Sequence, residues 1–151
     1  MGARVVSLQL KRGKGECPVA VDAVIGRVGG GLEGDRHADK ATRSVVVLDR
    51  STLDDLDLRP GDLREQITVE GVPSVTTLEP GTLLRVGGIT LRVNGPCEPC
   101  THIGEMNGVD DPEVFRRSLL GRRGAVCTVV AAEAIARVGD RVEVVSRVPA
   151  T

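Results

Sequence analysis

The sequence has almost no aromatic residues: one Phe, and neither Trp nor Tyr, in 151 positions. Because proteins commonly hold single-stranded nucleic acids by stacking bases on aromatic rings, that kind of binding is disfavoured. The formal net charge is -1 at pH 7, so the chain also lacks the positive excess that attracts nucleic acid or an anionic membrane surface. We therefore expect neither a nucleic acid nor a membrane as a partner.

The sequence also lacks a long apolar segment. Residues 1–16 contain no apolar stretch of the kind that a signal peptide carries, and no later run approaches the roughly 20 residues that span a bilayer. We expect the protein to remain in the cytoplasm. In that reducing compartment its four cysteines should be thiols rather than a disulfide framework.

What the sequence does contain is many short β-branched segments separated by turn residues. The 19 glycines and eight prolines favour a sheet protein over a helical bundle. We find no internal repeat and no linker, so residues 1–151 are predicted to form one domain. Alternating or continuous apolar runs predict about seven or eight strands, at residues 5–10, 19–28, 44–48, 66–70, 82–86, 89–93, 125–131 and 141–148.

Two short helices are predicted between these strands. The first covers residues 51–56, with Ser51 or Thr52 as its N-cap. The second begins at Pro112 after an Asp111 cap and runs to Leu120. This number and spacing of strands predicts a mainly β protein, a closed or nearly closed β-barrel.

Chemistry is most expected at the cysteines of the loop at residues 94–100, Asn-Gly-Pro-Cys-Glu-Pro-Cys. A loop held by a rigid sheet often carries reactive groups, and nearby cations favour the nucleophilic thiolate. A buried, inert thiol is the alternative interpretation of Cys100. Cys127 lies inside an apolar strand and is expected in the core, whereas Cys17 receives no role.

Cys97 and Cys100 have the spacing of zinc knuckles and of thiol oxidoreductases. A structural zinc site needs further ligands, which His102 could supply in part. A thioredoxin-type pair should open a helix, but Gly104 and the glycine at position 108 are expected to prevent one. Two alternatives to a reactive cysteine therefore stay open: a zinc-stabilised module, and a structural barrel that only binds a partner enzyme.

Three basic residues follow predicted strands or glycine-rich turns: Lys11, Arg36 and Arg64. A barrel can bring strand ends to one rim, and cations together with backbone amides hold phosphate or another oxyanion. For each residue alone, a solvated surface charge is the alternative.

Several motifs, in order along the chain, resemble the MOSC domain. This is the C-terminal domain of molybdenum-cofactor sulfurases, and it also occurs free-standing in bacteria. The motifs are GLEGDRH at 31–37, PGDLREQITVEG at 60–71, GTLLRVG at 81–87, PCEPC at 96–100, GRRGAV at 121–126 and VGD at 138–140.

The resemblance implies a strand-rich barrel that binds a molybdopterin-type cofactor. It also implies a cysteine that carries sulfur as a persulfide or ligates molybdenum, and Cys100 matches that position. Lys11, Arg36 and Arg64 match residues that lie near the pterin in relatives, and Gln66 stands where the family usually has Asn. Cys97 is an additional thiol, which could resolve a persulfide or sulfenate on Cys100 by forming a disulfide, or have no role in the chemistry.

The resemblance implies sulfurtransferase-type or molybdenum-cofactor-dependent activity, or cofactor binding without turnover. A cysteine desulfurase as sulfur donor, or a molybdoenzyme, would be the corresponding partner. Larger relatives also carry a pyridoxal-phosphate domain. We find none in this sequence and expect no pyridoxal phosphate in this module.

Overall fold

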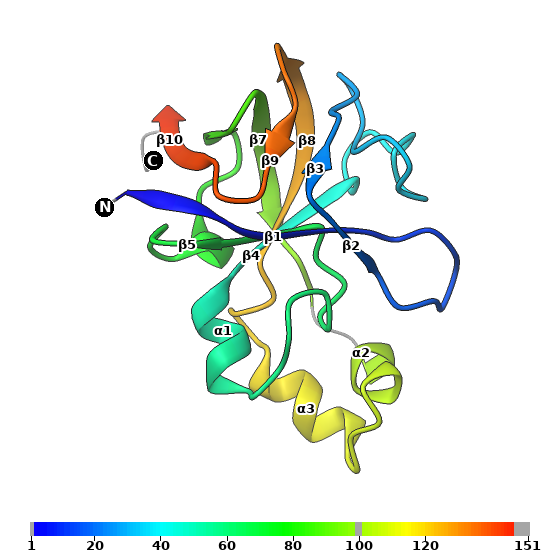
Figure 1. Ribbon diagram of the computed structural model, residues 1–151. Coiled ribbons are helices and arrows are strands. Elements are labelled where there is room, and N and C mark those ends of the chain that lie inside the picture. Colours follow the sequence, from blue (N-terminus) through cyan, green and yellow to red (C-terminus); the bar gives the residue numbers. More distant parts are fainter. Residues whose placement is uncertain (1, 99–100, 147–151) are drawn as a thin grey trace.

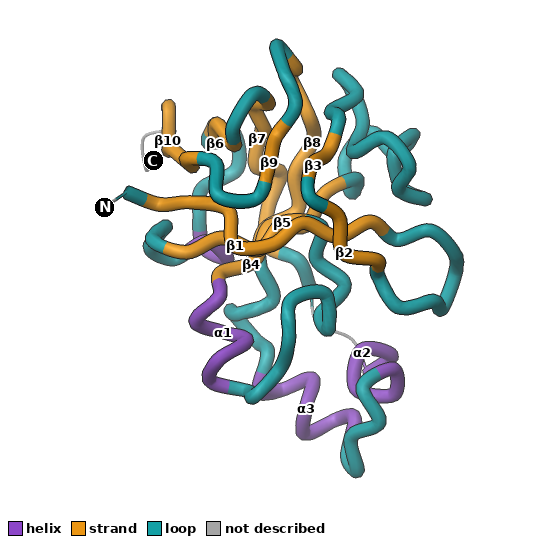
Figure 2. The backbone as a smooth tube through the Cα atoms, viewed as in Figure 1, coloured by secondary structure: helices purple, strands orange, loops and turns teal. Residues whose placement is uncertain are grey.

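The computed structural model describes residues 2–98 and 101–146 (Figures 1 and 2). Its elements, in chain order, are β1 (Ala3–Leu10), β2 (Val19–Val21), β3 (Ala23–Val24), β4 (Val45–Asp49), α1 (Arg50–Asp55), β5 (Ile67–Glu70), the 3-10 helix η1 (Val75–Thr77), β6 (Leu83–Val86), β7 (Ile89–Pro96), α2 (Thr101–Met106), α3 (Pro112–Ser118), β8 (Ala125–Ala132), β9 (Ala136–Arg137) and β10 (Arg141–Ser146). Over this part of the chain, no helix is long and apolar enough to cross a lipid bilayer.

Seven strands close into a barrel. Neighbouring strands pair in the order β1–β5–β4–β8–β7–β6–β10, and β10 pairs again with β1 to complete the ring. Strand β2 extends the sheet beyond β1, while β3 and β9 form a separate two-stranded ribbon. The β4–β5 pair is parallel and the other pairs are antiparallel. The predicted closed barrel of about seven or eight strands is confirmed.

Aliphatic side chains fill the barrel, as the near-absence of aromatics requires. Leu8, Ile67, Leu91 and Val129 are among its fully buried residues. Cys127 lies in the same core, which confirms the prediction from its apolar strand. Burial raises the pKa of the Cys127 thiol to about 12, so this cysteine is uncharged at neutral pH.

The three α-helices gather beyond one end of the barrel (Figures 1 and 2). They enclose a second, smaller apolar cluster, separate from the barrel core, formed by Leu48, Leu53, Leu63, Ile103 and Leu119. Leu63 directly precedes Arg64, and Ile103 follows the cysteine-containing segment. This cluster therefore anchors two of the segments that carry predicted site residues.

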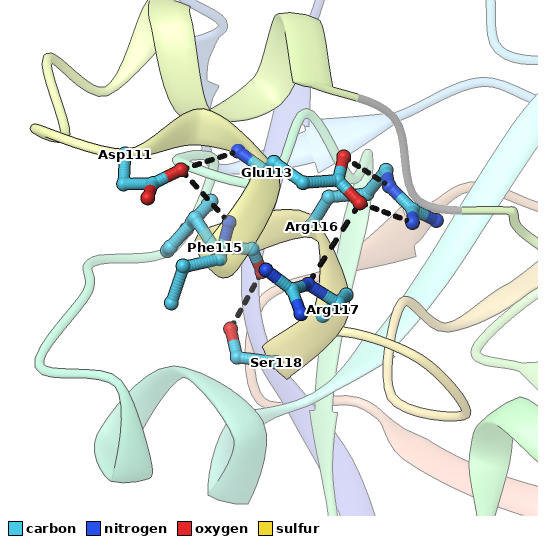
Figure 3. Close-up of polar contacts among 7 residues, drawn as sticks. Asp111, Glu113, Phe115, Arg116, Arg117 and Ser118 are labelled. Atoms are coloured by element: carbon cyan, nitrogen blue, oxygen red, sulfur yellow. Dashed lines mark hydrogen bonds and ion pairs between the residues drawn. The ribbon is translucent and has the colours of Figure 1, made fainter.

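The predicted cap of α3 is confirmed. The Asp111 carboxylate accepts hydrogen bonds from the backbone N–H groups of Glu113 and Val114, both at 3.2 Å (Figure 3). Glu113 in turn forms ion pairs with Arg116 and Arg117 (Figure 3). The helix ends at Ser118, two residues earlier than predicted.

Two other helix predictions are wrong. The cap of α1 is Asp49 and not Ser51 or Thr52, because the Asp49 carboxylate at the end of β4 accepts the Thr52 N–H at 3.1 Å. Helix α2 forms where glycine was expected to prevent it, which gives three α-helices instead of two. A Cβ at Gly104 would lie 2.9 Å from Pro112 Cα, so this glycine permits the close approach of α2 and α3.

The strand predicted at residues 19–28 is in fact two short strands. A bend at Asp22 redirects the chain, so that β2 pairs with β1 while β3 pairs with β9. The end of the last predicted strand, residues 147–148, lies outside the described residues.

Gly124 directly follows Arg122 and Arg123. We expect its replacement to destabilise the protein more than replacement of the nearby Gly121. Its φ is +89°, and an added Cβ would lie 2.3 Å from the Val47 carbonyl oxygen. Gly121 has a similar φ of +73° but open space around it. We expect Gly121→Ala to lower the unfolding free energy by about 1 kcal/mol, and Gly124→Ala by about 3 kcal/mol or more, because overpacking adds to the strain. Urea denaturation measures both, and equal losses would contradict this packing.

Candidate functional site

A buried carboxylate, Asp35, joins the end of β1 to the turn that follows the glycine-rich loop. Its Oδ1 accepts the Lys11 backbone N–H at 2.6 Å, and its Oδ2 accepts the His37 N–H at 3.0 Å. The Arg36 N–H also donates to the Lys11 carbonyl at 2.6 Å. Two of the predicted site residues, Lys11 and Arg36, are thereby held next to each other.

Gln66 contacts Asp35 and is fully buried. Its Nε2 donates to Asp35 Oδ2 at 3.2 Å and to the Ser44 carbonyl at 3.1 Å, and its Oε1 accepts the Val46 N–H at 2.7 Å. Both amide protons are committed to protein acceptors. The structure thus places this predicted cofactor-binding residue in a supporting position, where it orients Asp35.

Lys11 is the most unusual charge at this end of the barrel. The residue is only 5% exposed, and its ammonium group makes no hydrogen bond or ion pair with the described part of the chain. Burial lowers its pKa from 10.5 to about 8; the charge of Asp35 opposes this shift, and those of Arg64 and Arg123 reinforce it. At neutral pH the side chain is a mostly buried cation with no hydrogen-bonded or ion-pair partner among the described residues, and an external anion would stabilise it.

Arg64 is presented by a strained turn. Its φ is +60°, a left-handed conformation that costs an ordinary residue roughly 1–2 kcal/mol. The Arg64 N–H donates to the Gly61 carbonyl at 2.8 Å, and Nη1 donates to the Glu16 carbonyl at 2.7 Å in the loop after β1. Burial lowers the pKa of Arg64, and the charges of Arg36 and Arg123 lower it further. Strain of this kind often accompanies a functional position.

Arg123 was missed by the sequence reasoning. Its buried guanidinium donates to the Leu63 carbonyl through Nε at 3.2 Å and Nη2 at 2.7 Å, and Nη1 lies 3.1 Å from Cys97 Sγ and 3.4 Å from the Glu98 carbonyl. The one sequence signal was its place in the motif at 121–126. That pattern does not distinguish Arg123 from Arg122, which pairs with Asp55 instead.

We name Lys11, Arg36, Arg64 and Arg123 the cation cluster. Their charges act on one another, and Asp35 is the carboxylate whose charge acts on both Lys11 and Arg64. Burial lowers the pKa of the adjacent His37 to about 4, with the charges of Lys11 and Lys40 adding to the effect. His37 is therefore neutral at pH 7, and the positive surplus comes from the cation cluster itself.

A second buried acid, Glu65, directly follows Arg64. Its Oε2 accepts hydrogen bonds from the Gly61 N–H at 3.0 Å and the Thr68 hydroxyl at 2.8 Å. Oε1 has no partner among the described residues, and burial raises the pKa of the Glu65 carboxyl. Burial is the larger effect and disfavours the charged carboxylate, whereas the hydrogen bonds to Oε2 favour it.

The cysteines occupy different positions around the cation cluster. Cys97 is buried between Val46 and Val126, with Arg123 on its sulfur. Cys17 is exposed and lies near Arg64. Cys100, the predicted reactive residue, lies outside the described residues.

The zinc hypothesis required Cys97, Cys100 and His102. Cys100 and the His102 side chain are not described, so that set lies beyond the described residues. Elsewhere, within residues 2–98 and 101–146, no group of three or more His, Cys, Asp or Glu side chains could hold a metal ion.

The Cys97 segment also borders a pocket. The cavity has a volume of about 320 Å³, and its lining includes Thr76, Glu79, Cys97 and Glu98. Pockets of this volume lie at the lower end of the range for small-molecule sites. A small ligand thus has space next to the cysteine segment.

Comparison with known proteins places these features in a family. The model of the MOSC domain matches residues 35–143. No curated protein matches the chain.

Solved structures share the fold. The YUAD protein from Bacillus subtilis is 22% identical, with a TM-score of 0.81 over 94% of each chain. YiiM from Escherichia coli is 20% identical, with a TM-score of 0.67 over 96% of this chain and 71% of that one. YiiM from Geobacillus stearothermophilus is 16% identical, with a TM-score of 0.70 over 95% and 75%. At these identities the likeness shows a common fold.

Glu65 should make stability depend on pH. Because its pKa is raised in the folded protein, the folded state keeps a proton that the unfolded state releases near pH 4.5, so this contribution to stability falls as pH rises above that value. Glu65→Gln, which mimics the neutral acid, should therefore gain stability relative to the unmodified protein between pH 4.5 and 7. Urea denaturation at several pH values tests this, with the exposed Glu133→Gln as control. A difference that stays constant with pH would contradict the assignment.

Proposed function

The chain belongs to the MOSC domain family, and from this premise we propose that it binds a molybdopterin-type molybdenum cofactor at the cation cluster, with Cys100 as sulfur carrier or metal ligand. The observation that carries the proposal is the mostly buried side chain of Lys11, whose ammonium has no hydrogen bond or ion pair with the described residues. A desolvated cation of this kind is unfavourable unless an anion offsets it.

The residues of the cation cluster suit the phosphate of such a cofactor. Arg36 is exposed and Arg64 is half-buried, so both guanidinium groups can reach a ligand from solvent. A guanidinium binds phosphate with two parallel hydrogen bonds, whereas the Lys11 ammonium contributes a point charge. These three residues would hold the anionic end of the cofactor, and the bound cofactor would supply redox chemistry at molybdenum.

Two described contacts support a role for Cys100 at the same place. Before Cys100 in the sequence, the Glu98 carbonyl accepts a hydrogen bond from Arg123. After it, Ile103 packs in the cluster that contains Leu63. The chain on both sides of Cys100 is therefore attached to the turn that presents Arg64.

Cys97 is suited to resolve a sulfur carried on Cys100. Attack of a Cys97 thiolate on the inner sulfur of a Cys100 persulfide would form the Cys97–Cys100 disulfide and release hydrosulfide. The sulfur donor would be a cysteine desulfurase, and the acceptor a molybdoenzyme or its cofactor. For the protein to act as a sulfurtransferase-type catalyst, an external thiol would then have to reduce the Cys97–Cys100 disulfide before the next transfer.

Replacement of Lys11 should separate stability from ligand binding. Lys11→Met removes a buried charge, so we expect the ligand-free protein to gain about 1–3 kcal/mol of unfolding free energy at pH 7. Inorganic phosphate should raise the Tm of the unmodified protein but not that of Lys11→Met. The exposed Lys14→Met is the control and should respond like the unmodified protein. An equal phosphate response in Lys11→Met would refute the anion site.

Cys100 should be the most reactive thiol once the exposed Cys17 is removed. In a Cys17→Ser background, we expect Cys100→Ser to abolish modification by iodoacetamide at neutral pH, and Cys127→Ser to leave it unchanged because that thiol stays protonated. Peptide mass spectrometry resolves the modified position. Equal modification of every cysteine variant would exclude Cys100 as the reactive group.

About one zinc per chain, with unfolding on chelation, would point to a structural metal site instead.

A further inference from the structure

We propose that Arg123 is a positioning residue that couples the anion-binding side of the site to its sulfur side. This inference rests on the proposed function, which makes the surroundings of Lys11 and Arg64 the anion-binding side and the surroundings of Cys97 the sulfur side. The bridge itself rests on contacts of Arg123 alone. Neither the strand pattern nor the spacing of basic residues singles this arginine out.

One planar guanidinium reaches two segments that are far apart in the sequence. Its Nε and Nη2 converge on the carbonyl of Leu63, the residue that precedes Arg64. Its Nη1 points to Cys97 Sγ and the Glu98 carbonyl. Because the five N–H donors of arginine have a fixed fork geometry, a shift of one segment is transmitted to the other.

The backbone beside Arg123 is itself held rigidly. The Gly124 N–H donates to the Thr76 hydroxyl at 2.8 Å, and the Gly124 carbonyl accepts the Cys97 N–H at 2.9 Å. A Cβ at Gly124 has no space against Val47. The arginine is thus fixed at its base as well as at its guanidinium.

The charge of Arg123 also reaches the anion side, since it acts on both Lys11 and Arg64. Arg123 therefore has two separable roles: a long-range charge and a two-ended bridge. A lysine at this position keeps the charge, but its single ammonium cannot reproduce the fork. Arg122 offers a matched control, because its side chain pairs with Asp55 at 2.6 Å outside the site.

The test uses the full chain carrying ¹³C at cysteine Cβ, with the Cys97 signal assigned through its loss in Cys97→Ser. The Cys97 chemical shift is followed while inorganic phosphate is added. Hydrogen exchange of the Cys97 and Arg64 amides is measured separately; these amides bond to Gly124 and Gly61. In the unmodified protein we expect phosphate to shift the Cys97 signal and both amides to be protected.

Arg123→Lys should keep the phosphate affinity within about threefold but lose the phosphate-induced shift of Cys97, because charge survives and the bridge does not. In Arg123→Gln both amides should exchange at least about tenfold faster. Arg122→Lys and Arg122→Gln should behave like the unmodified protein in every measurement.

The proposal is overturned if Arg123→Lys retains the full Cys97 response, or if the Arg122 variants lose it equally. Should Arg123→Gln fail to fold, Arg123→Lys decides through the same two measurements. If the unmodified protein binds no phosphate, the proposed function fails. In that case unchanged amide exchange in Arg123→Lys would refute the bridge, and faster exchange of both amides would uphold it.

Discussion

The geometry of this site depends on one buried carboxylate. Asp35 accepts two backbone N–H groups, from Lys11 and His37, and the side-chain amide of Gln66. A buried carboxylate is tolerated only when such donors surround it. These hydrogen bonds to Asp35 fix the position of the end of β1 and of the turn that carries Arg36. Gln66 also connects Asp35 to strand β4 of the barrel, because its Oε1 accepts the Val46 N–H.

Around this junction the protein accepts several unfavourable features within a small region. Lys11 is a mostly buried ammonium, Arg64 has left-handed backbone angles, and Glu65 has a carboxyl oxygen without a partner among the described residues. The barrel core, by contrast, consists of aliphatic side chains and the uncharged Cys127 thiol. Local departures from good packing and pairing that occur together are typical of functional sites, where stability is sacrificed for ligand binding. Membership of the MOSC domain family and the presence of the cation cluster both agree with a binding function for this region.

The sequence predicts the barrel well, because strands of period two and the turn at Gly87 are local features. It also predicts Lys11, Arg36 and Arg64 as site residues, because they follow strands or turns; the structure brings their charges together, and their role in binding stays a prediction. It does not identify Arg123: two adjacent arginines look alike until the fold buries one of them and turns the other toward Asp55. Likewise, Gly104 appears as a helix breaker until the approach of α3 explains it. Such features are set by tertiary contacts.

Mass spectrometry of the protein isolated from its native cell, first under non-denaturing conditions and then after digestion, tests the central claim most directly. The proposed function predicts a co-purifying pterin phosphate, with or without molybdenum, and an additional sulfur on the peptide that contains Cys100 if that residue serves as the carrier. A chain that carries no pterin, with Cys100 unmodified and the mass of the bare polypeptide or of a zinc adduct, would contradict it.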